Sequence, residues 1–371
     1  LIVTFTEAAA AEMKERIGAA IEKKLSERPG DAHLEQQATL IHSAPITTIH
    51  SFCLSVIREH FHVIGIDPGF RIAEEGELKL LKQDVLEELL EECYASGDEA
   101  FIEFVERFGT GKNDRKIEGI ILKLYEYSRS YPQPEKWLDS CVKAYDLEAG
   151  DPESGDLESG NPEGGDPERS ECARWACRKA AQRAGDLRKI LERALKICEE
   201  PDGPYMYADM IEADLKEIEM LAGETTFSGM YAKAGNMKWK RLSSKKDETV
   251  SQEKKEQVQK LRKQVKDLVK KIQNTYFYAP CAEWAADMQA SRSSMEMLAE
   301  LVKRFAEMLS GKKQSRNMID FNDMEQFALR ILTEEKDGKL VPSAVASEYQ
   351  DRFEEVMIDE YQDSNLVQET I

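Results

Sequence analysis

Leu1-Ile-Val-Thr-Phe-Thr6 and Val356-Met-Ile-Asp-Glu-Tyr-Gln-Asp-Ser-Asn365 are the two stretches that decide the fold of this 371-residue chain. Each is a short apolar run that stops abruptly at polar side chains. Continuous apolar runs of this length are typical of strands buried on both faces of a parallel sheet. We therefore expect a buried strand at each end of the chain.

A third short apolar run, Ile46-Thr-Thr-Ile49, precedes His50-Ser51 and a helical pattern near 52–61. A helix is also expected from Glu7 to about Ser26, with Thr6 as its N-cap. Strands that alternate with helices in this way predict an α/β fold with a parallel sheet.

The carboxyl ends of these three expected strands all finish in functional groups. In parallel sheets, ligands bind beyond the carboxyl ends of the strands. Three strand ends that converge on one edge predict a single site there. Its candidate residues are Thr4, Phe5 and Thr6, then Thr48 and His50, then Asp359 and Glu360.

Asp359 and Glu360 are adjacent carboxylates at the end of the last strand. Asp359 could hold a hydrated Mg²⁺ ion while Glu360 orients or deprotonates an attacking water, which is the layout of an ATP-hydrolysing motor. Gln362 supplies an amide that could sense the phosphate or the water. An acid pair at the start of a loop is the plainer alternative, with Asp363 and Asn365 capping the next helix.

The pattern changes between about 71 and 314 to long helical runs. We expect a helical domain inserted into the α/β domain, so that 1–70 and 315–371 form one domain and 71–314 another. Amphipathic helices are expected over 77–94, 117–127, 173–198, 207–221, 253–276 and 281–309.

Charge is spread unevenly along a chain whose formal net charge is −20. Residues 146–171 hold ten acids and one Arg, and 149–168 form a five-residue Gly/Pro/acid repeat that we expect to be disordered. Residues 233–271 hold fourteen Lys or Arg against five acids. Lys238, Lys240 and Arg241 either contact nucleic-acid phosphates or form a solvated face. The apolar stripe that begins at Val258 favours a helical hairpin core.

The cysteines and the hydropathy indicate a cytoplasmic protein. Seven cysteines are scattered without a CxxC pair, which favours reduced thiols over a metal site. No apolar run reaches the roughly 18 residues of a membrane span, so we expect no membrane contact.

The extended strings resemble known motifs. Val356–Asn365 resembles the Walker B box of superfamily 1A DNA helicases, the UvrD/Rep group. Thr4–Met13 with Arg16, Ile46–Phe52, and Ile319-Asp-Phe-Asn-Asp-Met324 resemble three further motifs of that group. Within it, the chain is most similar to the AddA/RexA group of helicase–nucleases from bacterial recombination complexes, through Ala8–Ala11, 61–71 and 125–137.

The resemblance implies a partial RecA-like P-loop NTPase domain with an inserted helical domain, ATP and Mg²⁺ as cofactors, and 3′–5′ movement on single-stranded DNA. Asp359 would coordinate Mg²⁺ through water and Glu360 would act as the general base. Phe5 and Phe321 would form base pockets. Thr4, Thr6, Thr48 and His50 would touch the DNA backbone. A core position for either Phe, and a hinge role for His50, stay open as alternatives.

No G-x-x-x-x-G-K-[ST] phosphate loop occurs, and Phe108-Gly-Thr-Gly-Lys-Asn113 lacks the features of one. The resemblance implies that this loop comes shortly before the segment at Leu1, so we expect a fragment that is inactive alone. Its context would be double-strand break repair and recombination on single- and double-stranded DNA, with an AddB/RexB-like protein as heterodimer partner. The family's nuclease and iron–sulfur cysteines would lie downstream. A stand-alone UvrD/PcrA-type repair helicase and a non-catalytic DNA-binding scaffold are the alternatives.

Overall fold

The computed structural model describes residues 1–109, 114–145, 166–245 and 247–371. The chain divides into two compact units, of which the first comprises Leu1–Asp139 and Met297–Ile371 and the second Ser140–Glu296. The Gly-Thr-Gly-Lys loop and nearly all of the acidic repeat at 149–168 lie outside the described residues.

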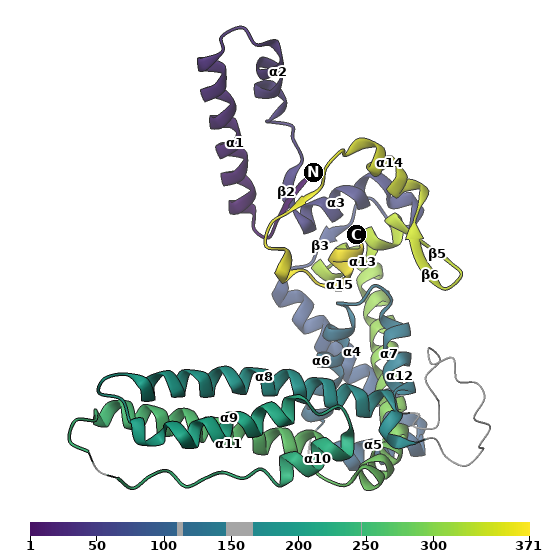
Figure 1. Cartoon of the computed structure of the whole chain (residues 1–371). Helices are drawn as coiled ribbons and strands as arrows, with labels where there is room; N and C mark the ends of the chain where they lie inside the picture. Colours follow the sequence, from purple (N-terminus) through teal and green to yellow (C-terminus); the bar gives the residue numbers. More distant parts are fainter. Residues whose placement is uncertain (110–113, 146–165, 246) are drawn as a thin grey trace. The chain divides into compact units, whose positions relative to one another are not determined.

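A three-stranded parallel sheet joins the two ends of the chain in the first unit (Figure 1). Its strands are β1 (Ile2–Thr4), β2 (Ile46–Thr48) and β7 (Met357–Ile358), in the order β2-β1-β7. Val3 pairs with Ile358 across one side of β1, and Thr4 pairs with Thr48 across the other. The expected parallel sheet and its three strands are confirmed.

The expectation that the last strand is buried was wrong. Met357 and Ile358 are 52% and 44% exposed, whereas Val3 on the central strand is 5% exposed. β7 has a neighbouring strand on one side only, and an apolar sequence run does not reveal whether a further layer covers it.

The helices α1 (Glu7–Glu27) and α3 (Ile49–His60) each follow a strand and begin at a threonine cap. The Thr6 hydroxyl accepts a hydrogen bond from Ala9 N at 3.1 Å, as expected for an N-cap. Thr48 caps α3, so that helix begins three residues before the expected position. α2 (Ala32–Leu40) lies between them.

α13 (Phe321–Leu332) packs against α3 and forms the core of the first unit with it. Phe52, Val56 and Ile57 from α3 meet Ala328 and Ile331 from α13 in this core. The helix that follows the sheet is thereby fixed to the helix that begins with the third functional motif.

The residues that lead into and out of the long helical stretch pair with each other. β3 (Arg71–Ile72) runs parallel to β4 (Met318–Ile319). The remaining elements of the first unit are α4 (Glu75–Ser96), α5 (Glu99–Phe108), α6 (Arg115–Ser128), the start of α7 (Pro134–Lys143), the hairpin β5 (Thr333–Lys336) and β6 (Lys339–Pro342), α14 (Ala344–Arg352) and α15 (Leu366–Thr370).

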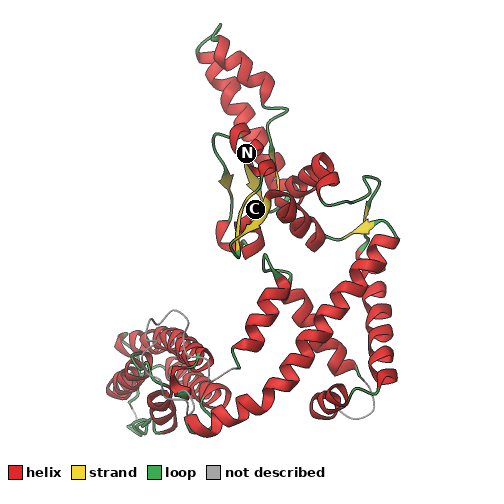
Figure 2. Cartoon of the chain, turned by 90° about the vertical axis from the view of Figure 1, so that its right-hand side faces the viewer, coloured by secondary structure: helices red, strands yellow, loops and turns green. Residues whose placement is uncertain are grey.

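Every element described in the second unit is helical (Figure 2). These helices are α8 (Glu171–Glu199), α9 (Ala208–Ala222), α10 (Phe227–Gly235), α11 (Gln252–Tyr276) and the first part of α12 (Cys281–Ser315). Val258, Val265 and Ile272 of α11 are buried in one cluster with α8, which confirms the hairpin-core interpretation. The six expected helices are all present. Within the described part of the chain, no helix has the length and apolar character to cross a membrane.

An ion pair lies inside the second unit. Arg262 Nε is 2.5 Å from Asp214 Oδ2, and the two residues are 4% and 0% exposed. The same guanidinium donates from Nη2 to Lys240 O at 2.6 Å. The pair therefore fixes α9, α11 and the basic segment before α11 to one another.

Arg262→Ala should lower the free energy of unfolding by about 3–5 kcal/mol, because the buried Asp214 carboxylate loses its partner. Urea denaturation followed by far-UV circular dichroism measures this. Arg188→Ala, which breaks an exposed pair with Glu192, should change it by less than about 1 kcal/mol. Equal effects of the two substitutions would contradict the role of the Arg262–Asp214 pair.

Candidate functional site

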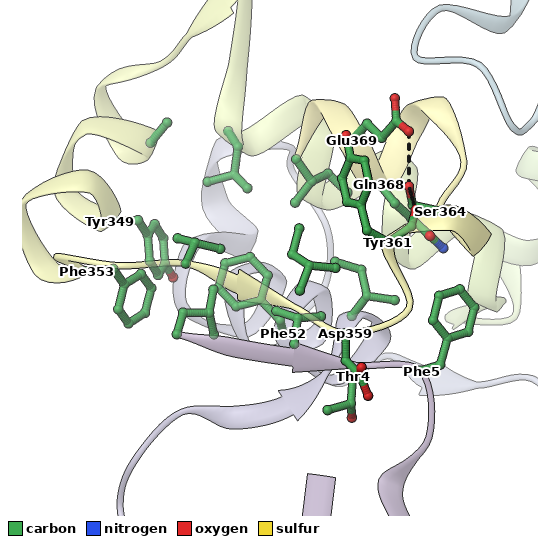
Figure 3. A pocket seen from close by; sticks show the side chains of 18 of the residues that line it. Thr4, Phe5, Phe52, Tyr349, Phe353, Asp359, Tyr361, Ser364, Gln368 and Glu369 are labelled. Atoms are coloured by element: carbon green, nitrogen blue, oxygen red, sulfur yellow. Dashed lines mark hydrogen bonds between the residues drawn. The ribbon is translucent and has the colours of Figure 1, made fainter. Parts of the chain in front are cut away.

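The candidate site is built at the carboxyl ends of β2, β1 and β7. Thr48 and Thr4 are in register, and Asp359 follows the residue that pairs with Val3. Asp359 N donates to Val3 O at 2.9 Å, so Asp359 lies beside Thr4 (Figure 3). The parallel register thus brings three of the expected site residues into one row.

The threonines of this row make hydrogen bonds within the protein. Thr4 is 1% exposed and its hydroxyl donates to Thr6 O at 3.0 Å, so it shapes the turn and presents no surface to a ligand. Thr48 is 7% exposed and its hydroxyl donates to Ser51 Oγ at 3.0 Å. Thr6 is exposed at the start of α1. The expected DNA contact by the Thr4 side chain has no support in this geometry.

The acid pair is held in an exposed loop with an unusual backbone. Glu360 has φ 53° and ψ 42°, a left-handed conformation that costs a non-glycine residue about 1–3 kcal/mol. Asp359 Oδ1 accepts a hydrogen bond from Glu360 N at 3.1 Å, and the Gln362 amide donates to Glu360 Oε2. Both carboxylates are exposed to solvent. Such strain at adjacent acids is typical of residues positioned for function.

The polar residues after the acid pair differ in role. Asn365 caps α15, and its side chain accepts from Gln368 N at 2.8 Å, which confirms its expected capping role. Asp363 lies in a short 3₁₀ helix with its backbone N–H directed to Glu360 O. The expectation that Asp363 caps the helix was wrong because the chain makes an extra turn before α15.

The donors at this end suit a hard cation shared with a phosphate ligand. Asp359 offers carboxylate oxygen, which Mg²⁺ prefers, and Mg²⁺ sites commonly combine one or two carboxylates with substrate phosphates. Among the described residues, no group of three or more His, Cys, Asp or Glu side chains could enclose a metal alone. The arrangement fits Mg²⁺ that arrives with a nucleotide.

A cavity of about 270 Å³ adjoins Asp359 over one face of the sheet (Figure 3). None of its described lining residues is Lys, Arg or His, so the cavity wall itself does not suit phosphate. The lining is mainly apolar, with Val3, Phe5, Phe52, Tyr349, Phe353, Ile358 and Tyr361 among its residues.

The two expected aromatic contacts are both available at the surface. Phe5 is 44% exposed after β1, and Phe321 is 58% exposed at the start of α13. The rings of Phe321 and His50 meet edge to face, with centroids 5.2 Å apart. Neither phenylalanine occupies the core position that was the alternative interpretation of the sequence.

Glu325 is a buried carboxylate that connects three segments of the site. It lies on α13 and is 4% exposed. His50 Nε2 is 3.2 Å from its Oε1, and Gln368 Nε2 donates to the same oxygen at 2.6 Å. Asn365 Nδ2 donates to Oε2 at 3.2 Å. Burial alone raises the pKa of Glu325, but the hydrogen bonds from His50, Gln368 and Asn365 outweigh it and hold the pKa below its ordinary value.

A second charged cluster fixes the start of α13. Lys313 Nζ is 3.0 Å from Asp320 Oδ2 and 2.5 Å from Asp323 Oδ2. Asp320 and Asp323 also form the capping box of α13. Burial raises the pKa of Asp320, but the charge of Lys313 outweighs this effect and lowers it. Arg129 Nη2 approaches Asp323 Oδ1 at 3.5 Å.

The basic residues expected to meet nucleic acid lie in the other compact unit. Lys238, Lys240 and Arg241 are exposed in the segment before α11. Between Lys238 and Lys240, Trp239 carries the Lys266 ammonium 5.2 Å from its ring centroid. The segment is thus anchored through its aromatic residue while its cations face solvent.

Sequence reasoning did not identify Glu325 or Lys313. The spacing of Asp320 and Asp323 before an apolar run is a capping signal that was available. Glu325 offered only a weak signal, an acid between apolar residues of an amphipathic helix. Its partners come from segments far away in the sequence, so only the fold reveals them.

Comparisons with known proteins agree with this geometry. The model of the UvrD/REP helicase N-terminal domain matches residues 1–154 and 170–371. The chain is 45% identical over 376 residues to the A-type chain of the "ATP-dependent helicase/nuclease" of Lachnoclostridium phytofermentans. It is 40% identical over 375 residues to proteins of the same name from Bacillus thuringiensis subsp. konkukian and Bacillus anthracis.

These alignments cover 100% of the chain but only 26% of the Lachnoclostridium protein and 29% of each Bacillus protein. The chain therefore spans less than a third of the length of these curated relatives.

Glu325→Gln should make stability less dependent on pH below the ordinary glutamate value of 4.5. Because the folded pKa is lowered, the unfolded state takes up a proton first, and the contribution of Glu325 is present above pH 4.5 and lost as pH falls below it. The variant should lose about 1–3 kcal/mol near neutral pH and progressively less in acid.

Urea denaturation at several pH values tests this. Glu22→Gln removes an exposed carboxylate and serves as the control. A difference between wild type and Glu325→Gln that stays constant across the acid range would contradict the assignment.

Proposed function

On the premise that the chain belongs to the UvrD/REP helicase N-terminal domain family, we propose that it forms part of a motor that couples ATP hydrolysis to movement along single-stranded DNA. The sheet β2-β1-β7 with α1 and α3 would be part of a RecA-like P-loop NTPase domain. Residues 1–70 and 315–371 would form this domain, and 71–314 the helical domain inserted in it.

The observation that carries this proposal is the parallel pairing of β7 with β1. It joins Asp359 to the end of β1, where Thr6, Phe5 and the start of α1 follow. In open α/β sheets this edge is where ligands bind. The strained backbone of Glu360 at the same edge supports the proposal independently.

In this proposal, Mg²⁺ with bound ATP neutralises the charge that develops on the phosphates. Asp359 holds the ion through water, and Glu360 takes a proton from the attacking water. Gln362, whose amide contacts Glu360 Oε2, orients that carboxylate and senses the phosphate. The family's phosphate loop is the part of the site that this sequence lacks.

Single-stranded DNA would meet the exposed rings of Phe5 and Phe321, whose stacking on bases is tolerant of sequence. Thr6 and His50 would touch the DNA backbone with the start of α3, where Thr48 serves as the cap. Movement would run 3′ to 5′. Lys238, Lys240 and Arg241 would add contacts to single- or double-stranded DNA.

The names of the relatives support a longer protein as the working form. We propose a cytoplasmic helicase–nuclease of the AddA/RexA type that acts in double-strand break repair and recombination. Its heterodimer partner would be AddB/RexB-like, and its iron–sulfur cluster would lie outside this chain. A stand-alone repair helicase is the second candidate, supported by the family match itself.

Glu360→Gln in the longer protein should leave ATP binding unchanged and lower DNA-stimulated ATP hydrolysis about 100-fold or more, because general-base catalysis contributes about 10²–10⁴-fold. Equilibrium binding of a labelled nucleotide and a phosphate-release assay measure the two effects. Glu369→Gln, on the exposed face of α15, is the control. Undiminished turnover in Glu360→Gln would remove that residue from its role. Loss of turnover with intact binding is not expected of a scaffold protein.

Neutralising Lys238, Lys240 and Arg241 together should reduce the salt dependence of DNA affinity, because each lost phosphate contact lowers the log–log slope by about 0.7 for single strands and 0.9 for duplex. Fluorescence anisotropy at several salt concentrations measures the slope. Lys23, Lys24 and Arg28 at the end of α1 provide a control set with equal charge. An unchanged slope would identify the basic segment as a solvated face.

A further inference from the structure

Glu325 belongs to neither the acid pair nor the aromatic surface, yet it contacts both neighbourhoods. Its Oε1 is shared by His50 at 3.2 Å and Gln368 at 2.6 Å. His50 lies in the first turn of α3, and Gln368 in the first turn of α15. A shift of His50 therefore changes the acceptor that Gln368 uses.

The amides on the α15 side have no freedom to turn over. Asn365 Oδ1 accepts from Gln368 N at 2.8 Å, and Gln368 Oε1 accepts from Asn365 N at 3.4 Å. Their NH₂ groups both donate to Glu325. Because each oxygen caps α15, only an acceptor with two free oxygens satisfies both NH₂ groups, and an ionised carboxylate is that acceptor.

The acid loop is held at two points. Asp359 N is bonded to Val3 O at one end, and the α15 cap is bonded to Glu325 at the other. The intervening residues, which include Glu360 and Gln362, span from the sheet edge to this cap. The position of Glu325 thus sets the far end of the loop that carries Glu360.

The aromatic surface lies on the opposite side of the same carboxylate. Phe321 is four residues before Glu325 on α13, and its ring meets that of His50 at 5.2 Å. Phe321 is 58% exposed and the His50 side chain 36% exposed, so a planar ligand can reach both. A base stacked on Phe321 would press on His50, whose Nε2 is held by Glu325.

We propose that Glu325 is a positioning residue that couples single-stranded DNA at the His50–Phe321 pair to the geometry of the Asp359–Glu360 loop. The inference rests on the proposed function, because it takes the pair as the DNA contact and the acids as the ATP-hydrolysing groups. Coupling of this kind requires that DNA favour one arrangement of the His50–Glu325–Gln368 contacts over another.

Hydrogen–deuterium exchange of the chain with and without oligothymidylate tests the coupling directly. In wild type, DNA should slow exchange about fivefold or more both around 48–52 and 319–324 and in the loop and helix 359–370. In Glu325→Gln, the first two regions should keep their protection while 359–370 loses it. The Gln amide would place an NH₂ group against one of the donors.

Two further variants separate coupling from stability. Ile331→Val shortens a buried side chain of α13 outside the network, so it should weaken the core and leave DNA-induced protection of 359–370 intact. Gln368→Met removes the link from the α15 side with Glu325 in place, and it should reproduce the loss in Glu325→Gln. It also serves if Glu325→Gln does not fold.

The outcomes distinguish the inference from the proposed function. A wild-type chain that shows no DNA-dependent protection around Phe321 would overturn the DNA contact and the coupling with it. Protection around Phe321 without any at 359–370 would overturn the coupling alone. In the longer protein, Glu325→Gln should lower the stimulation of ATP hydrolysis by DNA about fivefold or more with DNA-independent hydrolysis within about twofold of wild type. Equal stimulation in both proteins would also overturn the coupling.

Discussion

The hydrogen bonds between β1 and β7 are the constraint on which the rest of the first unit depends. Met357 N donates to Leu1 O and Asp359 N donates to Val3 O, both at 2.9 Å. These two bonds join segments at opposite ends of the sequence, so they form only after the chain between them has been brought together. Because the register places Asp359 beside Thr4, the chemistry of the site is a consequence of strand pairing.

α13 converts that pairing into a connected site. Its first turn is fixed by Lys313 through Asp320 and Asp323, and its second turn holds Glu325 against His50 and α15. Buried charges are costly unless each is paired. Both networks satisfy this condition with partners from distant segments, so they specify one arrangement of these helices and disfavour others.

Local patterns in the sequence were sufficient for the strands, the six long helices and the Thr6 cap, because periodicity and capping depend on neighbouring residues. They were insufficient for burial of β7, which depends on the layer above it, and for the Thr4 hydroxyl, which turns onto its own backbone. Asp359 and Glu360 were found because they follow an apolar run. Glu325 was not found, since its importance arises from three partners that no sequence spacing relates.

The pairing of β3 with β4 means that the polypeptide between Ile72 and Met318 starts and finishes at one place. The sheet and its carboxyl edge consequently experience that long excursion only through a narrow doorway. Lengthening a flexible excursion changes its closure entropy slowly. Evolution could therefore enlarge, exchange or decorate this appendage while the machinery at the strand ends stays undisturbed.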